Sequence, residues 1–204
     1  PAGYYCPKGG TSPVACGNSS VFCAAGSARP VSVAHEHYTI GGTSPTSRHD
    51  EAICPTGYYC EDGVKSMCPA GAFGEARGVT GPTCSGRCPA GWYCPAGSAN
   101  SFALPCGGPD LFCPEESRRP LPVDSGFFAG GRNIDRRGEQ GGYSMQARCP
   151  IGRWCKEGVS FPCPPGRYGS TQASKNSSCT GPCREGHFCP KGSYRADQVM
   201  SKIL

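Results

Sequence analysis

Cys54-Pro-Thr-Gly-Tyr-Tyr-Cys60 is the stretch from which the fold follows, and it returns as Cys149-Pro-Ile-Gly-Arg-Trp-Cys155. In the shared pattern Cys-Pro-x-Gly-x-aromatic-Cys, proline presets the backbone for the second position of a type I turn. Glycine suits the exit of that turn. The pattern therefore predicts a reversal of the chain that brings the two flanking cysteines near one another.

The whole cysteine frame repeats with this pattern. Six cysteines recur 95 residues later, and residues 54–98 align with residues 149–193 without a gap, with 18 of 45 positions identical. The stretch Pro1-Ala-Gly-Tyr-Tyr-Cys6 likewise matches Pro89-Ala-Gly-Trp-Tyr-Cys94, which Cys88 precedes. We therefore expect a cysteine immediately before Pro1, and we interpret the chain as about two periods of a longer array.

The composition excludes a large hydrophobic core. Only 26 of the 204 residues are Leu, Ile, Val or Phe, whereas 17 are Cys, 31 are Gly and 21 are Pro. The formal net charge of +5 is low for a disordered chain. These numbers predict a small disulfide-rich fold of short β-hairpins and turns with almost no helix, and they exclude Rossmann, barrel, bundle and coiled-coil architectures.

The cysteine content also predicts the compartment. Cytosolic glutathione would keep these thiols reduced, so we expect an extracellular or cell-surface location reached through the secretory pathway. The longest uninterrupted apolar run is Val21 to Ala25, far below the roughly 20 residues of a membrane helix. No membrane span is therefore expected in this segment, and no nucleic-acid partner is expected either.

The cysteine spacing predicts a series of modules. We expect cysteine modules at 1–23, 54–84, 88–113 and 149–179, the start of a further module and a tail at 183–204, and cysteine-free hairpin segments at 24–53 and 114–148. The two cysteine-free segments are interpreted as hairpins because extended residues in each end at a glycine pair. Modules that contact mainly their neighbours predict an elongated rod. Only Arg195 to Leu204 has helical spacing, and a frayed terminus or linker is the preferred interpretation there.

Two disulfide schemes fit the spacing. A crossed scheme within each module pairs Cys54 with Cys68, Cys60 with Cys84, Cys88 with Cys106, Cys94 with Cys113, Cys149 with Cys163, and Cys155 with Cys179. Nearest-neighbour pairing instead joins Cys68 to Cys84 and Cys183 to Cys189, and leaves only Cys6 unmatched. We prefer the crossed scheme because it makes each module a compact knot with loops worth about 3 kcal/mol each in the chain-entropy model.

The repeated phrases resemble a known group of modules. Cys68-Pro-Ala-Gly-Ala-Phe-Gly74, Cys84-Ser-Gly-Arg-Cys-Pro-Ala-Gly-Trp-Tyr-Cys-Pro-Ala-Gly-Ser98 and their copies are similar to cysteine-rich ephrin-receptor-like repeats, which are related to tumour-necrosis-factor-receptor-like and EGF-like modules. Similar arrays, with the Tyr-Thr-x-Gly-Gly segment found here at Tyr38 to Gly42, occur in very large surface proteins of protists and algae. The resemblance covers nearly all of the chain and implies an extracellular rod, but no particular ligand.

Two functions follow as hypotheses. The first is a structural repeat protein of a fibre, hair-like appendage or cell coat, whose partners are further copies of itself or other surface proteins. The second is a receptor or adhesion ectodomain that binds a protein or glycan ligand. Contacts between copies are expected at Tyr38 and Ile40 and at their counterparts Phe128 and Ala129. The alternative for these residues is that they brace the joint between consecutive modules.

Sequence motifs of catalysis and metal binding are not found. The chain has no glycine-rich phosphate loop, no Gly-x-Ser-x-Gly elbow and no helical His-Glu-x-x-His, so we expect no enzyme and no cofactor. His35-Glu36-His37 lies near His49 but has no further ligand at a recognisable spacing, so no metal site is predicted. Acidic residues interleave with a basic cluster, which favours a solvated loop over a site for acidic glycan: Arg132, Arg136 and Arg137.

Seven cysteines directly follow an aromatic residue. We expect these rings to cover the disulfides as the small core of each module, with a ligand-binding stripe as the alternative: Tyr5, Phe22, Tyr59, Tyr93, Phe112, Trp154 and Phe188. Two glycosylation sequons, Asn18-Ser-Ser20 and Asn176-Ser-Ser178, lie between cysteines in loops that should face solvent. We therefore predict covalent N-glycan on Asn18 and Asn176.

Overall fold

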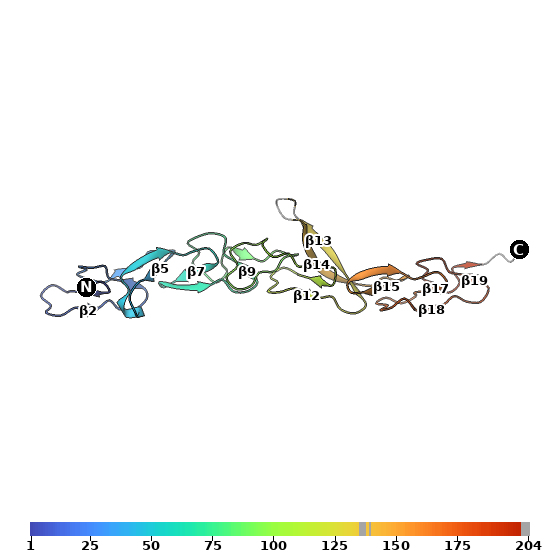
Figure 1. Ribbon diagram of the computed structural model, residues 1–204, viewed down its shortest axis with the longest axis horizontal. Helices are drawn as coiled ribbons and strands as arrows, with labels where there is room; N and C mark the ends of the chain where they lie inside the picture. Colours follow the sequence, from blue (N-terminus) through green and yellow to red (C-terminus); the bar gives the residue numbers. More distant parts are fainter. Residues whose placement is uncertain (135–137, 139, 201–204) are drawn as a thin grey trace. The chain divides into compact units, whose positions relative to one another are not determined.

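The protein is built almost entirely from short antiparallel hairpins (Figure 1). A computed structural model describes residues 1–134, 138 and 140–200. In these residues every sheet has two strands, and the one helical element is a single 3-10 turn, η1 (Pro45–Ser47). The predicted disulfide-rich hairpin fold is confirmed.

The chain forms two compact units. The first contains Pro1–Cys88 and Cys94–Ser101, and the second contains Pro89–Tyr93 and the described residues from Phe102 onward. The strand pairs of the first unit, in chain order, are β1 (Tyr4–Tyr5) with β2 (Val14–Ala15), β3 (Val21–Phe22) with β4 (Val31–Ser32), β5 (His37–Ile40) with β6 (Asp50–Ile53), β7 (Tyr58–Glu61) with β8 (Val64–Met67), and β9 (Ala72–Phe73) with β10 (Gly86–Arg87).

The second unit repeats this order and begins with β11. Its strand pairs are β11 (Leu111–Phe112) with β12 (Leu121–Pro122), β13 (Phe127–Ile134) with β14 (Gln140–Arg148), β15 (Arg153–Lys156) with β16 (Val159–Pro162), β17 (Arg167–Tyr168) with β18 (Gly181–Pro182), and β19 (His187–Phe188) with β20 (Val199–Met200). The stretch 195–204 was considered for a helix, but Val199 and Met200 form β20, and residues 201–204 lie outside the described residues. A hairpin forms in each cysteine-free segment, as expected.

The Cys-Pro-x-Gly pattern makes a turn that differs from the predicted one. The amide of Tyr58 donates to the carbonyl of Pro55 at 3.3 Å, and Gly57 between them has φ +80°. A four-residue turn with positive φ at its third position is type II, and glycine is the residue that adopts this conformation without strain. Proline is therefore the first residue of a type II turn, and the prediction of a type I turn that starts at cysteine is wrong.

The glycine of each such turn forms a main-chain joint between the two halves of its own module. Gly57 donates to the carbonyl of Gly74 at 2.7 Å and accepts from the amide of Cys68 at 3.0 Å. Gly152 makes the equivalent two bonds in the second copy, at 2.7 Å to Gly169 and 2.9 Å from Cys163. Because both bonds use main-chain atoms only, the joint does not depend on the neighbouring side chains.

A second main-chain joint attaches each long hairpin to the module that follows it. Tyr38 in β5 bridges to Gly63, and the amide of Thr39 donates to the carbonyl of Gly63 at 3.0 Å. Gly63 has φ +74°, and a Cβ there would lie on the carbonyl oxygen of Ser19. Only glycine fits this close approach of three chain segments.

The second unit repeats this joint, which bears on the two interpretations of the hairpin residues. Phe128 bridges to Gly158, and the amide of Ala129 donates to the carbonyl of Gly158 at 2.8 Å. Ala129 is only 8% exposed. Phe128 and Ala129 therefore brace consecutive modules within the chain, and contact of the half-buried Tyr38, Ile40 and Phe128 with another copy stays a prediction.

Cystines form the core of every module. Almost all of the fully buried side chains are half-cystines, whereas the ring before the cysteine is half-exposed at six of the seven positions and 53% exposed at Phe188. The prediction that each of these rings forms the core of its module is wrong for Phe188. The ring that is buried is Trp92, which lies two residues before Cys94 and is 4% exposed.

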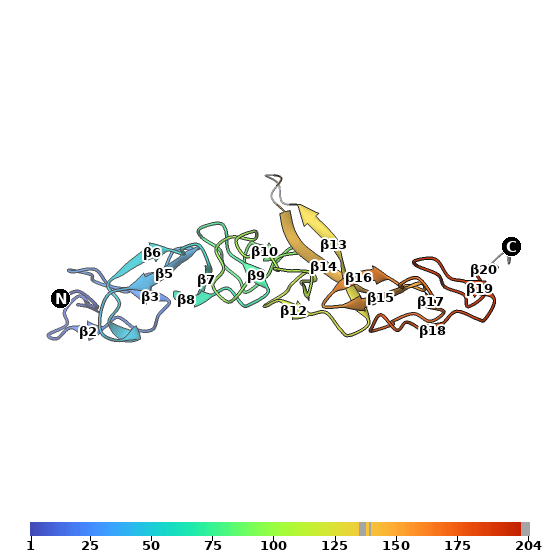
Figure 2. The same cartoon turned by 45° about the vertical axis from the view of Figure 1, so that its right-hand side comes forward.

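The long hairpin of β13 and β14 is seen in Figure 2. Residues of this hairpin pack on Trp92 and explain its burial. Gly141 at the start of β14 lies against the indole, and a Cβ on it would come within 2.4 Å of the ring. Gly142 donates to the carbonyl of Gly91 at 2.9 Å, and Asn133 Nδ2 donates to the carbonyl of Ala90 at 2.7 Å. In the first unit the equivalent hairpin has strands of four residues, and the residue equivalent to Trp92 is Tyr4, which is 39% exposed.

Candidate functional site

Eight disulfides join consecutive cysteines. The pairs are Cys16–Cys23, Cys54–Cys60, Cys68–Cys84, Cys88–Cys94, Cys106–Cys113, Cys149–Cys155, Cys163–Cys179 and Cys183–Cys189. The crossed scheme is therefore wrong at every pair that it named, and nearest-neighbour pairing holds throughout. The eight bridges indicate an oxidising compartment.

Local turn geometry explains the four pairs whose cysteines are six residues apart. The type II turn of Pro55-Thr-Gly-Tyr58 reverses the chain within one module, so the Cα atoms of Cys54 and Cys60 lie 5.7 Å apart. A disulfide needs Cα atoms about 4.4–6.8 Å apart. Cys60 is thus held at bonding distance by the turn before any longer loop closes, and this outweighs the larger entropic gain that a longer loop would bring.

Cys6 is the free cysteine of the described residues, and it is exposed. Its equivalent in the second period is Cys94, which bonds to Cys88. The position equivalent to Cys88 would come directly before Pro1, so the predicted partner of Cys6 falls outside the chain and stays a prediction.

The first unit carries a groove of about 590 Å³ between the loop before β5 and the β7–β8 turn. Its polar lining comes from two short runs, His35-Glu36-His37 on one wall and Glu61-Asp62 on the other. His37 Nδ1 is 2.9 Å from the carbonyl oxygen of His35, which occupies one ring nitrogen. In the part of the chain that the structure describes, no group of three His, Cys, Asp or Glu side chains is arranged to hold a metal ion.

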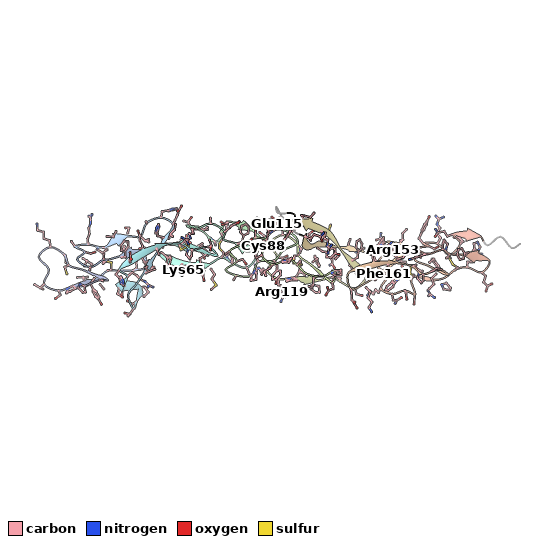
Figure 3. All side chains as sticks on the ribbon, turned by 45° about the horizontal axis from the view of Figure 1, so that its top comes forward. Lys65, Cys88, Glu115, Arg119, Arg153 and Phe161 are labelled. Carbon is pink, nitrogen blue, oxygen red and sulfur yellow. A yellow bond between two sulfur atoms is a disulfide. The ribbon has the colours of Figure 1, made fainter. Side chains whose placement is uncertain are left out.

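The second unit carries a groove of about 350 Å³ beside β15 and β16, and its lining is more aromatic: Pro109, Asp110, Trp154, Lys156, Glu157, Val159 and Phe161. Trp154 and Phe161 are directly opposite in the strand register and their rings stack with centroids 4.8 Å apart. Phe161 and its neighbour Arg153 are labelled in Figure 3. The equivalent residues in the first unit are Tyr59 and Ser66, so this stack exists in one copy only. The two grooves share their backbone frame and differ in chemistry.

The basic cluster is only partly within the described residues. The guanidinium of Arg132 lies 5.2 Å from the ring centroid of Tyr143, and its Nη1 donates to Gln140 Oε1 at 3.0 Å. Arg136 and Arg137 lie outside the described residues. Arg132 is exposed but lies in strand β13, so the predicted solvated loop is wrong for Arg132.

Both sequon asparagines are exposed and form short turns with their own sequon serines. Asn18 Oδ1 accepts from the amide of Ser20 at 3.0 Å and from its hydroxyl at 2.5 Å. Asn176 Oδ1 accepts from the amide of Ser178 at 3.1 Å. Asx-turns of this kind are typical of surface loops, and the side-chain nitrogen of each asparagine faces away from the turn bond.

No protein-family model matches the chain, and no curated protein matches it. Among the described residues, no helix has the length and apolarity that crossing a membrane requires.

Sequence reasoning missed both grooves. The sequence marks Trp154 only as one of the aromatic residues before a cysteine, and it gives Phe161 no predicted role. The signal that identifies them is the difference between copies, because Tyr59 and Ser66 become Trp154 and Phe161 at two positions that face each other across a hairpin.

Proposed function

We propose that this chain is part of an extracellular structural repeat protein of a fibre, hair-like appendage or cell coat, secreted and held together by intramolecular disulfides. The observation that carries the proposal is the repeated main-chain joint. Gly71 and Gly166 each donate to the carbonyl of a cysteine in the following module, Cys94 and Cys189 respectively. Each also accepts from the amide of the first cysteine of that module, Cys88 and Cys183 respectively.

Such joints suit a protein that grows by repetition. Each module is closed by its own cystine and bonded to its neighbour through glycine, so modules can be added without a new side-chain interface. Side chains away from the joints differ freely between copies, for example Gly78-Val-Thr-Gly-Pro82 against Ala173-Ser-Lys-Asn-Ser177. Many modest contacts between copies would then sum to a durable assembly.

The test is to locate the parent protein on its own cells. Antibodies raised against the oxidised 204-residue chain are expected to label a fibre or coat at regular spacing in electron micrographs, and to detect the protein in disulfide-linked or sedimenting material rather than as single particles. Antibodies against the reduced and alkylated chain provide the matched control. Labelling of isolated, monomeric particles in the membrane would overturn the proposal.

A receptor or adhesion ectodomain is the second candidate, and the difference between the two grooves favours it. A purely structural array has no need of a stacked Trp154–Phe161 pair in one copy and an acidic, histidine-containing wall in the other. Monomeric surface particles that bind a ligand at one groove would support this candidate.

A further inference from the structure

We propose that the groove beside β15 and β16 binds a neutral glycan of pyranose sugars carried by another molecule. This goes beyond the structural role proposed above. The groove combines an exposed aromatic stack with carboxylates and an ammonium group at its edge, on walls that the backbone holds in place. Each of these observations comes from described residues of the second unit.

The aromatic stack supplies the apolar contact. Trp154 and Phe161 lie with an angle of 26° between their ring planes, and Phe161 is 39% exposed. One face of a pyranose ring presents a set of C–H groups, and these are attracted to the negative face of an aromatic ring. Because the two rings stack, each covers one face of the other, and the sugar would pack on the outer face of one ring.

Hydrogen bonds from a side chain join the two strands of the hairpin that carries the stack. Arg153 Nε donates to Ser160 Oγ at 2.7 Å, and its Nη2 donates to the carbonyl of Ser160 at 2.9 Å. On the opposite wall, Pro109 lies so close to Gly158 that a Cβ on the glycine would overlap the proline carbonyl. Both walls are therefore formed before a ligand arrives, which lowers the entropic cost of binding.

The polar groups match hydroxyl groups rather than charges. Asp110 and Glu157 present carboxylate acceptors, and Lys156 Nζ lies 3.6 Å from Glu157 Oε1 with both side chains mostly exposed. Two carboxylates and one ammonium group leave a net negative charge at the groove. This repels sulfated or uronic-acid glycans and leaves neutral sugars, whose hydroxyl groups both donate and accept.

The size of the groove fits a short stretch of glycan. Its volume of about 350 Å³ is at the lower end of small-molecule sites, which span roughly 300–1,000 Å³. The equivalent surface of the first unit has Tyr59 opposite Ser66 and therefore lacks the stack. The first unit thus provides an internal control on the same backbone.

The experiment uses oxidised chain produced without N-glycan and titrates it with three probes, cellohexaose, chitohexaose and mannohexaose. Binding is followed by NMR at the indole N–H signals of the two tryptophans. At least one probe is expected to bind with Kd of about 10 μM to 1 mM, and to shift the Trp154 signal while the signal of buried Trp92 stays in place. A repeat with N-glycosylated chain, before and after amidase treatment, tells whether the chain's own glycans compete for the groove.

Two substitutions give the second unit the residue types found at the equivalent positions of the first unit. Trp154→Tyr and Phe161→Ser are each expected to weaken binding about tenfold or more, whereas Tyr59→Ala in the first unit leaves Kd within about twofold. The folding control is peptide mapping, which should find all eight disulfides in each variant. The proposal is overturned if none of the three probes shifts Trp154 at about 10 mM, if Tyr59→Ala weakens binding as much as Trp154→Tyr, or if self-association of the chain alone produces the shift.

Discussion

Gly141→Ala is expected to lower the free energy of unfolding of the second unit by about 2–4 kcal/mol. The added methyl group would meet Trp92 Cη2 at 2.4 Å and Cζ2 at 2.5 Å. Overpacking of this kind costs about 1–3 kcal/mol. Displacement of the indole would also weaken its edge-to-face contact with Phe102, whose ring centroid lies 5.1 Å away, by about 0.5–1.5 kcal/mol.

Full expulsion of the indole sets the upper limit. A tryptophan buries about 150–250 Å², which at about 25 cal/mol per Å² corresponds to about 4–6 kcal/mol. Local strain costs less, so we expect the ring to shift within the unit rather than leave it. Gly130→Ala is the matched control, because Gly130 lies in the same hairpin and a Cβ there has its nearest neighbour, Met145 Cγ, at 3.7 Å.

The assay is guanidinium unfolding of the oxidised chain in a Trp154→Phe background, where Trp92 is the one remaining tryptophan of the sequence. Gly141→Ala is expected to move the midpoint to lower denaturant and to make the Trp92 emission more accessible to acrylamide, while Gly130→Ala changes neither. Equal stabilities of the two variants, within about 0.5 kcal/mol and with equal quenching, would refute the assignment of β14 as the cover of Trp92.

Three further outcomes are expected. Reduction of the disulfides should unfold the chain outright, because so few large apolar side chains cannot offset about 1–2 kcal/mol of backbone entropy per residue; native dispersion of proton spectra in strong reductant would contradict this. Gly63→Ala should lower the free energy of unfolding of the first unit by about 3–4 kcal/mol, because its Cβ would overlap the Ser19 carbonyl and disrupt the hydrogen bonds there. The control Gly26→Ala, with φ +84° and open space around it, should lower this free energy by about 1 kcal/mol. Hydrogen exchange of the first unit measures both changes, and equal effects would exclude the joint. N-glycan should be present on Asn18 and Asn176 of chain made in a secretory pathway, as a mass loss on amidase treatment; unshifted peptides would contradict it.

The part of the fold that is encoded locally could be predicted from the sequence. Composition and the 95-residue period were enough for a disulfide-rich chain of hairpins, because few apolar residues and regularly spaced cysteines allow little else. The pairing was mispredicted although the decisive information is local. The turn at Pro55 brings Cys54 and Cys60 together, and its geometry should have outweighed the entropy of longer loops.

Features that join distant parts of the chain had no such signal. Trp92 is buried because Gly141, in a hairpin far along the chain, leaves room for the indole. The only trace in the sequence is that 35 residues separate Cys113 from Cys149 and 30 separate Cys23 from Cys54, so the second hairpin is longer. The Trp154–Phe161 stack likewise becomes visible only when the strand register is known.

The short reach of the disulfides has a mechanical consequence. A pull on the two ends of the chain cannot extend the residues inside a closed loop, and no bridge here spans more than 16 residues. The stretches 24–53 and 114–148 contain no cysteine, so the chain there can extend fully once their hairpins open. At about 3.3–3.6 Å per residue, these stretches would span at most roughly 100 Å and 120 Å when fully extended. Under a stretching force, the cystine modules would keep their length, and the cysteine-free hairpins between them would unfold and extend.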